Sequence, residues 1–173
     1  MPAFAIQTDR DQLVVDRLGA AFPEAVLAQE QFHDMRCFTV RKESLHDILR
    51  FLRDELDFNF LTTLCGMHYP ATEGQEDLLG LVIHLHSFRY RHRIRLKANT
   101  PLKDPAFPTF TDLWPATNWM EREAFDFYGL TFTGHPNLKR ILNMEDFPAF
   151  PMRKDYPLED PTREDKNDSM FGR

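Results

Sequence analysis

Residues 78–98 read LLGLVIHLHSFRYRHRIRLKA, and the pattern in this segment determines the fold class that we predict. Apolar residues recur at strand spacing near both of its ends, which is typical of strands that bury one face. One continuous strand here would be far longer than the usual length of about five to six residues. We therefore expect two strands, in residues 77–88 and 93–98, with a reversal of the chain near residues 89–92.

Two helices and three further strands are predicted upstream of this reversal. Ser44 with Asp47 has the spacing of a helix cap, and apolar residues then fall on one stripe of residues 45–56. A similar pattern begins at Thr8 and ends before Pro23. The three strands are expected in residues 25–31, 35–40 and 60–68. The order helix, two strands, helix, three strands predicts a two-layer α+β domain with helices against one face of a mixed sheet.

Downstream of Asn99 the pattern changes to irregular chain with one more helix. Prolines recur through residues 101–115, and each removes a backbone donor, which predicts a loop. Asn118 with Glu121 predicts the cap of a last helix, and Gly129 is well placed to end it. The chain should then divide into an α+β core domain with its proline-rich loop (1–116), a last helix and turn (117–142) and an extended C-terminal arm with a charged end (143–173).

The composition disfavours several classes of function. The 173 residues carry a formal charge of −6, so a nucleic-acid backbone would be repelled. No apolar run is long enough to span a membrane, and we expect no direct membrane insertion. Cys37 and Cys65 stand apart and are expected to be buried, reduced thiols, since an iron–sulfur cluster usually needs four thiolate ligands.

Two features of the predicted strands leave their function open. His84 and His86 alternate along one strand and project from one face, as two metal ligands could. No third ligand is identifiable, so packed or solvent-facing histidines are the simpler interpretation. The segment from Arg89 to Lys97 holds five Arg and Lys residues and no acid. These cations either pair with carboxylates of this chain or dock onto an acidic surface of another molecule.

The predicted last helix carries four charged residues close together. Arg122 and Asp126 have the four-residue spacing of a helical ion pair. On a helical wheel Glu121 falls on the mainly apolar side, opposite Arg122, Asp126 and the fourth residue, Glu123. A carboxylate at position 121 either caps the first turn or meets a cation or donor from another chain at a buried interface.

These residues belong to a longer motif that resembles a known family. Residues 118–142, NWMEREAFDFYGLTFTGHPNLKRIL, resemble the signature of the C subunit of respiratory complex I, the proton-pumping NADH:quinone oxidoreductase. The residues that carry the resemblance are Glu121, Arg122, Glu123, Asp126, Gly129, Gly134, His135, Pro136, Lys139, Arg140, Ile141 and Leu142. A fainter similarity covers residues 43–158, and Met120, Ala149 and Phe150 depart from the family pattern.

The resemblance implies a non-catalytic structural subunit of the peripheral arm of complex I. It implies an α+β domain with an extended, proline-rich arm in a hetero-oligomer, with the D, B and I subunits of complex I as its neighbours. No cofactor is expected on this chain, whereas FMN, iron–sulfur clusters, NADH and quinone are expected on other subunits. The partner interface is expected to include Glu121, Arg122, Glu123, Asp126, His135, Lys139, Arg140, Arg153, Lys154 and Asp155.

Other interpretations stay open on the sequence alone. The nearest is the equivalent subunit of a membrane-bound hydrogenase or of a ferredoxin:plastoquinone reductase, because such assemblies share this module. A stand-alone module could instead bind an acidic partner through residues 89–97. The first residues show no presequence, which favours the cytoplasmic face of a bacterial inner membrane, or the mitochondrial matrix side for a processed organellar chain.

Overall fold

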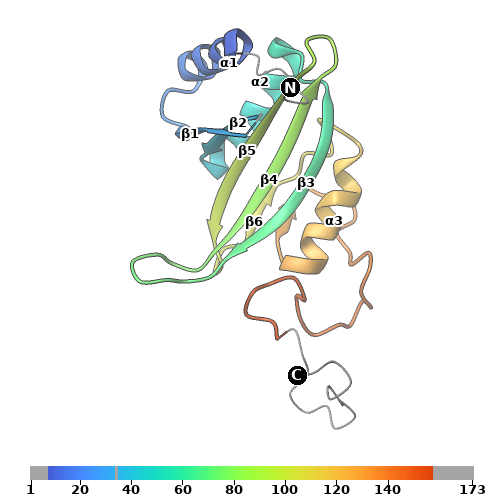
Figure 1. Cartoon of the computed structure of the whole chain (residues 1–173). Coiled ribbons are helices and arrows are strands. Elements are labelled where there is room, and N and C mark those ends of the chain that lie inside the picture. Colours follow the sequence, from blue (N-terminus) through green and yellow to red (C-terminus); the bar gives the residue numbers. More distant parts are fainter. Residues whose placement is uncertain (1–7, 34, 158–173) are drawn as a thin grey trace, which may run out of the picture.

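The computed structural model describes residues 8–33 and 35–157, in which helices lie against one side of a twisted five-stranded sheet (Figure 1). In chain order the elements are α1 (Thr8–Ala21), β1 (Val26–Phe32), β2 (Met35–Val40), the 3-10 helix η1 (Lys42–Ser44), α2 (Leu45–Leu56), β3 (Phe60–Tyr69), β4 (Leu78–Ser87), β5 (His92–Pro101), β6 (Ala106–Pro108), α3 (Thr117–Tyr128) and β7 (Thr131–Thr133). The α+β class predicted from the sequence is confirmed.

The sheet is mixed, and the predicted reversal joins two of its inner strands. The strand order is β1-β2-β5-β4-β3, in which β2 and β5 are parallel and the other neighbours are antiparallel. Arg91 turns the chain between β4 and β5 with a φ of 51°. Leu85 then lies opposite Ile94, and His84 lies opposite Arg95. Because successive side chains alternate between faces, this register separates an apolar face from a polar one.

The apolar face carries the core. Seven apolar residues of β4 and β5 there are at most 1% exposed, namely Leu79, Leu81, Ile83, Leu85, Ile94, Leu96 and Ala98. The predicted stripe of α2 belongs to the same cluster and consists of Leu45, Ile48, Leu49, Leu52 and Leu56. Burying a side chain of this size contributes about 1.5–3 kcal/mol, so this layer is the main source of stability.

The last helix, α3, covers the β3 side of the same face. Gly66 of β3 permits the close approach, because a Cβ there would lie 2.5 Å from Cδ2 of Tyr128 on α3. Gly129 ends the helix as predicted, with a φ of 78° and its N–H donated to the carbonyl of Phe125 at 2.9 Å.

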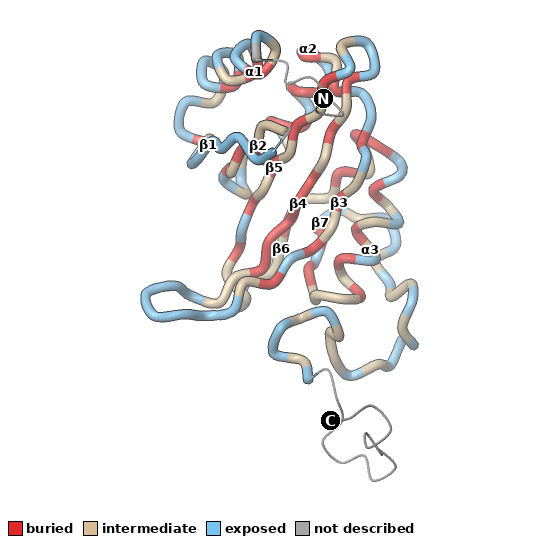
Figure 2. Tube along the Cα trace, in the orientation of Figure 1, coloured by how far each residue is buried: buried red, intermediate tan, exposed pale blue. Residues whose placement is uncertain are grey.

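The opposite face of β3, β4 and β5 is left without a helix over it in the described part of the chain. Figure 1 shows these strands in front of the helices, and Figure 2 shows half-buried positions alternating with buried ones along β5. We call this surface the open face, and its central residues are His84, His86, Arg93, Arg95 and Lys97.

Two predicted helix caps are wrong. Ser44 already has helical backbone angles, since η1 leads directly into α2, and its side chain makes no capping bond. Asn118 lies inside α3, which begins at Thr117 and has no side-chain cap on Ala116. The capping pattern was present in the sequence at both sites, but preceding turns had already started the helices.

The proline-rich loop contains a short element that the sequence did not reveal. β6 and β7, of three residues each, pair in parallel with Phe107 opposite Phe132. The described part of the predicted arm, residues 143–157, consists of turns and irregular chain. Its charged end, like Asp34 of the predicted strand reversal, lies outside the described residues. Among the described helices, none combines the length and the apolar character needed to cross a membrane.

Candidate functional site

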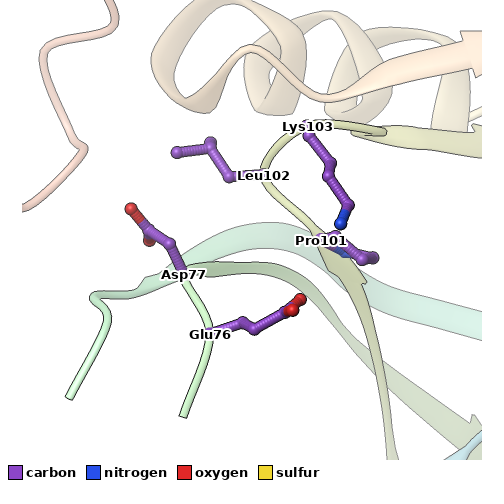
Figure 3. Close-up of a pocket in the computed structure, with 5 residues that line it drawn as sticks. All are labelled: Glu76, Asp77, Pro101, Leu102 and Lys103. Atoms are coloured by element: carbon purple, nitrogen blue, oxygen red, sulfur yellow. The ribbon is translucent and has the colours of Figure 1, made fainter. Parts of the chain in front are cut away.

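A hollow of about 420 Å³ lies beside the β3–β4 loop and the end of β5 (Figure 3). Its lining residues are Glu76, Asp77, Pro101, Leu102 and Lys103. The carboxylates of Glu76 and Asp77 point away from each other, and Asp77 accepts a hydrogen bond from His68 at 2.6 Å. Acid–base catalysis needs groups that converge on one substrate atom, and the two carboxylates of this lining do not converge. The hollow therefore does not present a pair of carboxylates to a substrate.

The histidines of β4 are engaged by their neighbours on the open face. Nε2 of His84 accepts a hydrogen bond from Nε of Arg95 at 2.8 Å, and the His86 ring lies 4.7 Å from that of Phe88. A histidine whose lone pair is taken by a guanidinium is not poised to bind a metal. Within residues 8–33 and 35–157, no three His, Cys, Asp or Glu side chains are grouped to hold one. The geometry favours the packed-histidine interpretation.

Both cysteines are free thiols. Cys37 is buried, as predicted, but Cys65 is only half-buried. Burial raises the pKa of each thiol, which keeps both protonated and makes them poor nucleophiles and poor metal ligands.

The densest set of polar contacts lies where α3 meets the chain after β7. We call it the clasp, formed by Arg122 and Asp126 of α3, Arg140, Asn143 and the backbone of residues 139–149. Asp126 is its centre and has no exposed surface. A carboxylate in that position must find its donors inside the chain.

The carboxylate of Asp126 accepts five hydrogen bonds from the irregular segment. Its Oδ2 accepts the backbone N–H groups of Ile141, Leu142 and Asn143 at 2.8–3.0 Å. Its Oδ1 accepts from Nδ2 of Asn143 at 3.0 Å and from Nη1 of Arg140 at 2.8 Å. Burial alone would raise the pKa of Asp126, but these donors outweigh it and hold the pKa far below its usual range.

Two arginines complete the clasp by donating to backbone carbonyls. Arg140 reaches the carbonyls of Asp126 at 2.8 Å, Phe147 at 2.8 Å and Ala149 at 3.1 Å. Arg122 donates to the carbonyls of Lys139 and Arg140, both at 3.0 Å. The charged groups of the clasp therefore fix a segment that has no helix or strand of its own.

Glu121 lies on the other side of α3 and is also fully buried. Its Oε1 accepts the backbone N–H of Phe110 at 2.7 Å, and its Oε2 accepts the hydroxyl of Thr109 at 2.7 Å. Burial raises the pKa of Glu121, and these hydrogen bonds offset only part of the rise. The prediction that Glu121 faces the apolar side is confirmed. It does not cap its own helix, and donors from this chain suffice to explain its burial.

Two histidines attach irregular segments to regular elements. His135 accepts the N–H of Asn137 on Nδ1 at 3.0 Å and donates from Nε2 to the carbonyl of Asn118 at 3.1 Å. His68 accepts the N–H of Lys154 on Nδ1 at 2.8 Å and donates from Nε2 to Asp77. In each ring the Nδ1 acceptor fixes the tautomer with its proton on Nε2.

The structure distributes the ten predicted interface residues over three places. Arg122, Asp126, Arg140 and the carbonyl of Lys139 meet in the clasp. The predicted Arg122–Asp126 ion pair is wrong, because Arg122 binds carbonyls and Asp126 pairs with Arg140. Asp126 does lie opposite Glu121 as predicted, but it is buried, because the irregular segment after β7 folds over it. The second place is the arm near His68, which carries Arg153, Lys154 and Asp155. The other three residues, Glu121, Glu123 and His135, lie on or beside α3 but outside the clasp.

The sequence did not reveal the roles of Asn143, which binds Asp126 in the clasp, or of His68, which binds the backbone of the arm. Their partners are 17 and 86 residues away along the chain, and no helical or strand period connects such positions. It also missed large apolar side chains that stand exposed beside the clasp, namely Trp119, Leu142 and Met144. The Arg122 guanidinium lies 5.2 Å from the centre of the Trp119 ring, so this tryptophan adjoins the clasp.

Sequence comparisons connect the chain to one family of proteins. The family model described as "Respiratory-chain NADH dehydrogenase, 30 Kd subunit" matches residues 38–162. The NADH-quinone oxidoreductase C subunit of Roseiflexus castenholzii is 47% identical over 147 residues, which are 84% of this chain and 83% of that protein. The corresponding C subunit of Citrifermentans bemidjiense is 40% identical over 150 residues, which are 87% and 91% of the two chains.

Two solved structures share the fold. A trypsin-resistant fragment of Nqo5, residues 1–134, is 27% identical with a TM-score of 0.64, over 75% of this chain and 99% of the fragment. A chain of the membrane-bound sulfane sulfur reductase, an archaeal respiratory membrane complex, has a TM-score of 0.71 over 85% of each chain. Its identity of 24% supports a common fold and nothing further.

Proposed function

Because this chain belongs to the family of the respiratory-chain NADH dehydrogenase 30 kDa subunit, we propose that it is a non-catalytic structural subunit of the peripheral arm of NADH:quinone oxidoreductase. The clasp is the observation that carries the proposal. Its charged groups bind backbone atoms of their own chain. Such an arrangement gives a loop a fixed shape, which is what a subunit needs in order to hold its neighbours at fixed spacing.

The clasp also supports a division of roles among the ten residues that we propose for the interface. Glu123, Lys139, Lys154 and Asp155 are exposed and can touch a neighbouring subunit directly. Glu121 and Asp126 are buried and act indirectly, by holding the segments that carry exposed residues. Trp119, Leu142 and Met144 add apolar area beside the clasp, which is the composition of a contact surface.

We extend the proposal to the rest of the assembly. The D, B and I subunits of complex I are the proposed neighbours, and FMN, the iron–sulfur clusters, NADH and quinone are proposed to bind to other subunits. The chain has two cysteines, fewer than the four thiolate ligands that a cluster usually needs, and this supports the absence of a cluster from it. The proposed location is the cytoplasmic face of a bacterial inner membrane, or the matrix side in a mitochondrion.

Affinity purification of the tagged full-length chain from gently solubilised membranes tests this function. We expect stoichiometric recovery with NADH-oxidising, cluster-bearing and quinone-site subunits, and a visible spectrum that belongs to them. The isolated chain should be colourless. Elution of the chain alone near 20.4 kDa, or a stoichiometric redox-active chromophore on the isolated folded chain, would overturn the proposal.

The rival function is the equivalent subunit of a related respiratory assembly, and a chain of the sulfane sulfur reductase shares the fold. The same purification separates the two functions. Recovery with an NADH-oxidising module supports the first, and recovery with a hydrogenase or ferredoxin-linked module supports the second.

A further inference from the structure

The open face presents a row of cations that the core of the protein does not need. The pairing of β4 with β5 places Arg95 opposite His84 and Lys97 opposite Val82. These residues point away from the buried leucines, because the positions next to them in each strand belong to the core. In Figure 1, α2 lies behind the sheet, α1 beyond β1 and α3 beside β3, so no described helix lies in front of this row.

Arg95 is held in one orientation from two sides. Its Nε donates to Nε2 of His84 at 2.8 Å, and its guanidinium lies 5.2 Å from the centre of the Phe32 ring. Burial lowers the pKa of His84, and the nearby charges of Arg95 and Arg93 lower it further, so the ring stays neutral and remains an acceptor. The contact with Nε leaves Nη1 and Nη2 available, and these two nitrogens can bind a carboxylate.

No carboxylate of the described chain neutralises this group. Within residues 8–33 and 35–157, neither Arg95 nor Lys97 has an Asp or Glu oxygen within 4.0 Å. The acid brought nearest by register is Glu30, which pairs with Cys37 on β2 and so lies two strands from Arg95. Lys42, in contrast, has Asp104 at 2.6 Å. Arg95 and Lys97 are thus an excess of positive charge on a chain of net charge −6.

Aromatic side chains flank the cations at both edges of the open face. Phe32 lies on the β1 side and is 49% exposed. Phe60 and Phe88 lie on the β3 side, with ring centres 4.9 Å apart, and both are exposed. An arginine against one exposed aromatic ring, with two more exposed rings at the other edge of the same face, has the composition that protein interfaces favour. A nucleic-acid surface would need many more cations.

We propose that the open face, centred on Arg95, is the docking surface for an acidic segment of another protein subunit. A carboxylate of that segment binds Nη1 and Nη2 of Arg95, a second lies near Lys97, and apolar residues beside them contact Phe32 and Phe60. This inference rests on the proposed function, since it names the chemistry of one contact within the assembly.

Zero-length crosslinking of the assembled complex tests the proposal on the wild-type protein. A carbodiimide joins a lysine amine only to a carboxylate in direct contact with it. We expect Lys97 to be linked to an Asp or Glu of another subunit, while Lys103, an exposed lysine in the turn after β5, serves as the internal reference. The proposal would be contradicted if Lys97 were linked only to carboxylates of its own chain or to no carboxylate. Protection of Lys97 from the crosslinking reaction by RNA or lipid would also contradict it.

A charge-reversal variant provides a second, independent test. Arg95→Glu should lower recovery of the chain with the complex by about tenfold or more, because two carboxylates would then face each other. Arg50→Glu, at an exposed position of α2 on the other side of the sheet, should leave recovery unchanged within about twofold. Equal recovery of Arg95→Glu and wild type overturns the inference alone, whereas a wild-type chain found outside any complex overturns the proposed function.

Discussion

Arg140 in the clasp and Arg95 on the open face carry the same guanidinium but use it in opposite ways. Arg140 donates to one carboxylate and three backbone carbonyls, all within this chain. Arg95 donates to one histidine and has no carboxylate partner in the described residues. The family motif thus contains charges that bind groups within this chain, whereas Arg95, outside the motif, carries the charge that we propose for a partner. Membership of the family motif therefore does not by itself make a residue part of an interface.

The largest loss of stability is expected from substitution of Asp126, the centre of the clasp. Asp126→Asn should lower the free energy of unfolding by about 3–5 kcal/mol, because it leaves the largely buried Arg140 without its counter-charge. Denaturant unfolding of the purified chain measures it. Asp47→Asn, which removes an exposed carboxylate 3.6 Å from Arg50, should cost at most about 1 kcal/mol. Similar losses for the two variants would mean that the clasp does not stabilise the fold.

Glu121 should show a smaller effect that depends on chemistry and pH. Glu121→Ala leaves the buried N–H of Phe110 without an acceptor and should cost about 1–3 kcal/mol. Glu121→Gln keeps an acceptor and should stay within about 1 kcal/mol of wild type at pH 7.

The same pair of proteins tests the raised pKa of Glu121. The folded state holds the proton at a pH where the unfolded state, with a pKa of about 4.3, has released it. Wild-type stability should therefore fall relative to Glu121→Gln as the pH rises from the unfolded pKa toward the folded pKa. A wild-type advantage that grows over this range would reverse the sign and contradict the argument.

His68 should control the arm with little effect on the rest of the chain. His68→Ala removes the acceptor of the Lys154 N–H, and we expect amide exchange at Lys154 and Met152 to accelerate about tenfold, for a local loss of about 1–2 kcal/mol. Hydrogen exchange followed by NMR gives this residue by residue. His33→Ala, at an exposed position, is the control. Unchanged exchange in the arm would show that the histidine does not anchor it.

The smallest effect on stability is expected at Arg95. Arg95→Gln should change the free energy of unfolding of the isolated chain by less than about 1 kcal/mol, because among the described residues the side chain makes one hydrogen bond and no ion pair. Thermal or denaturant unfolding checks this value. A loss above about 2 kcal/mol would place Arg95 with Arg140, as a residue that holds the fold, and would remove the contrast between the two regions.

The sequence predicted the parts of the fold that repeat with a clear period. The bounds of α2 match residues 45–56, and the β4–β5 reversal follows from the impossible length of a single strand. β6 and β7 were not predicted, because a strand of three residues is too short to show a periodic pattern in the sequence. The partners of Asp126 could not be inferred, since a helical wheel ranks an aspartate as polar and cannot reveal that an irregular segment folds back over it.

The role of this chain in electron transfer can be tested by redox titration of the iron–sulfur clusters, followed by EPR, in complexes that contain Arg122→Ala. This change removes both hydrogen bonds to the carbonyls of Lys139 and Arg140 and loosens the clasp. We predict less assembled complex and unchanged midpoint potentials in the complex that forms. Normal assembly with a shifted cluster potential would contradict the account, because the chain would then tune a redox centre instead of holding its neighbours in place.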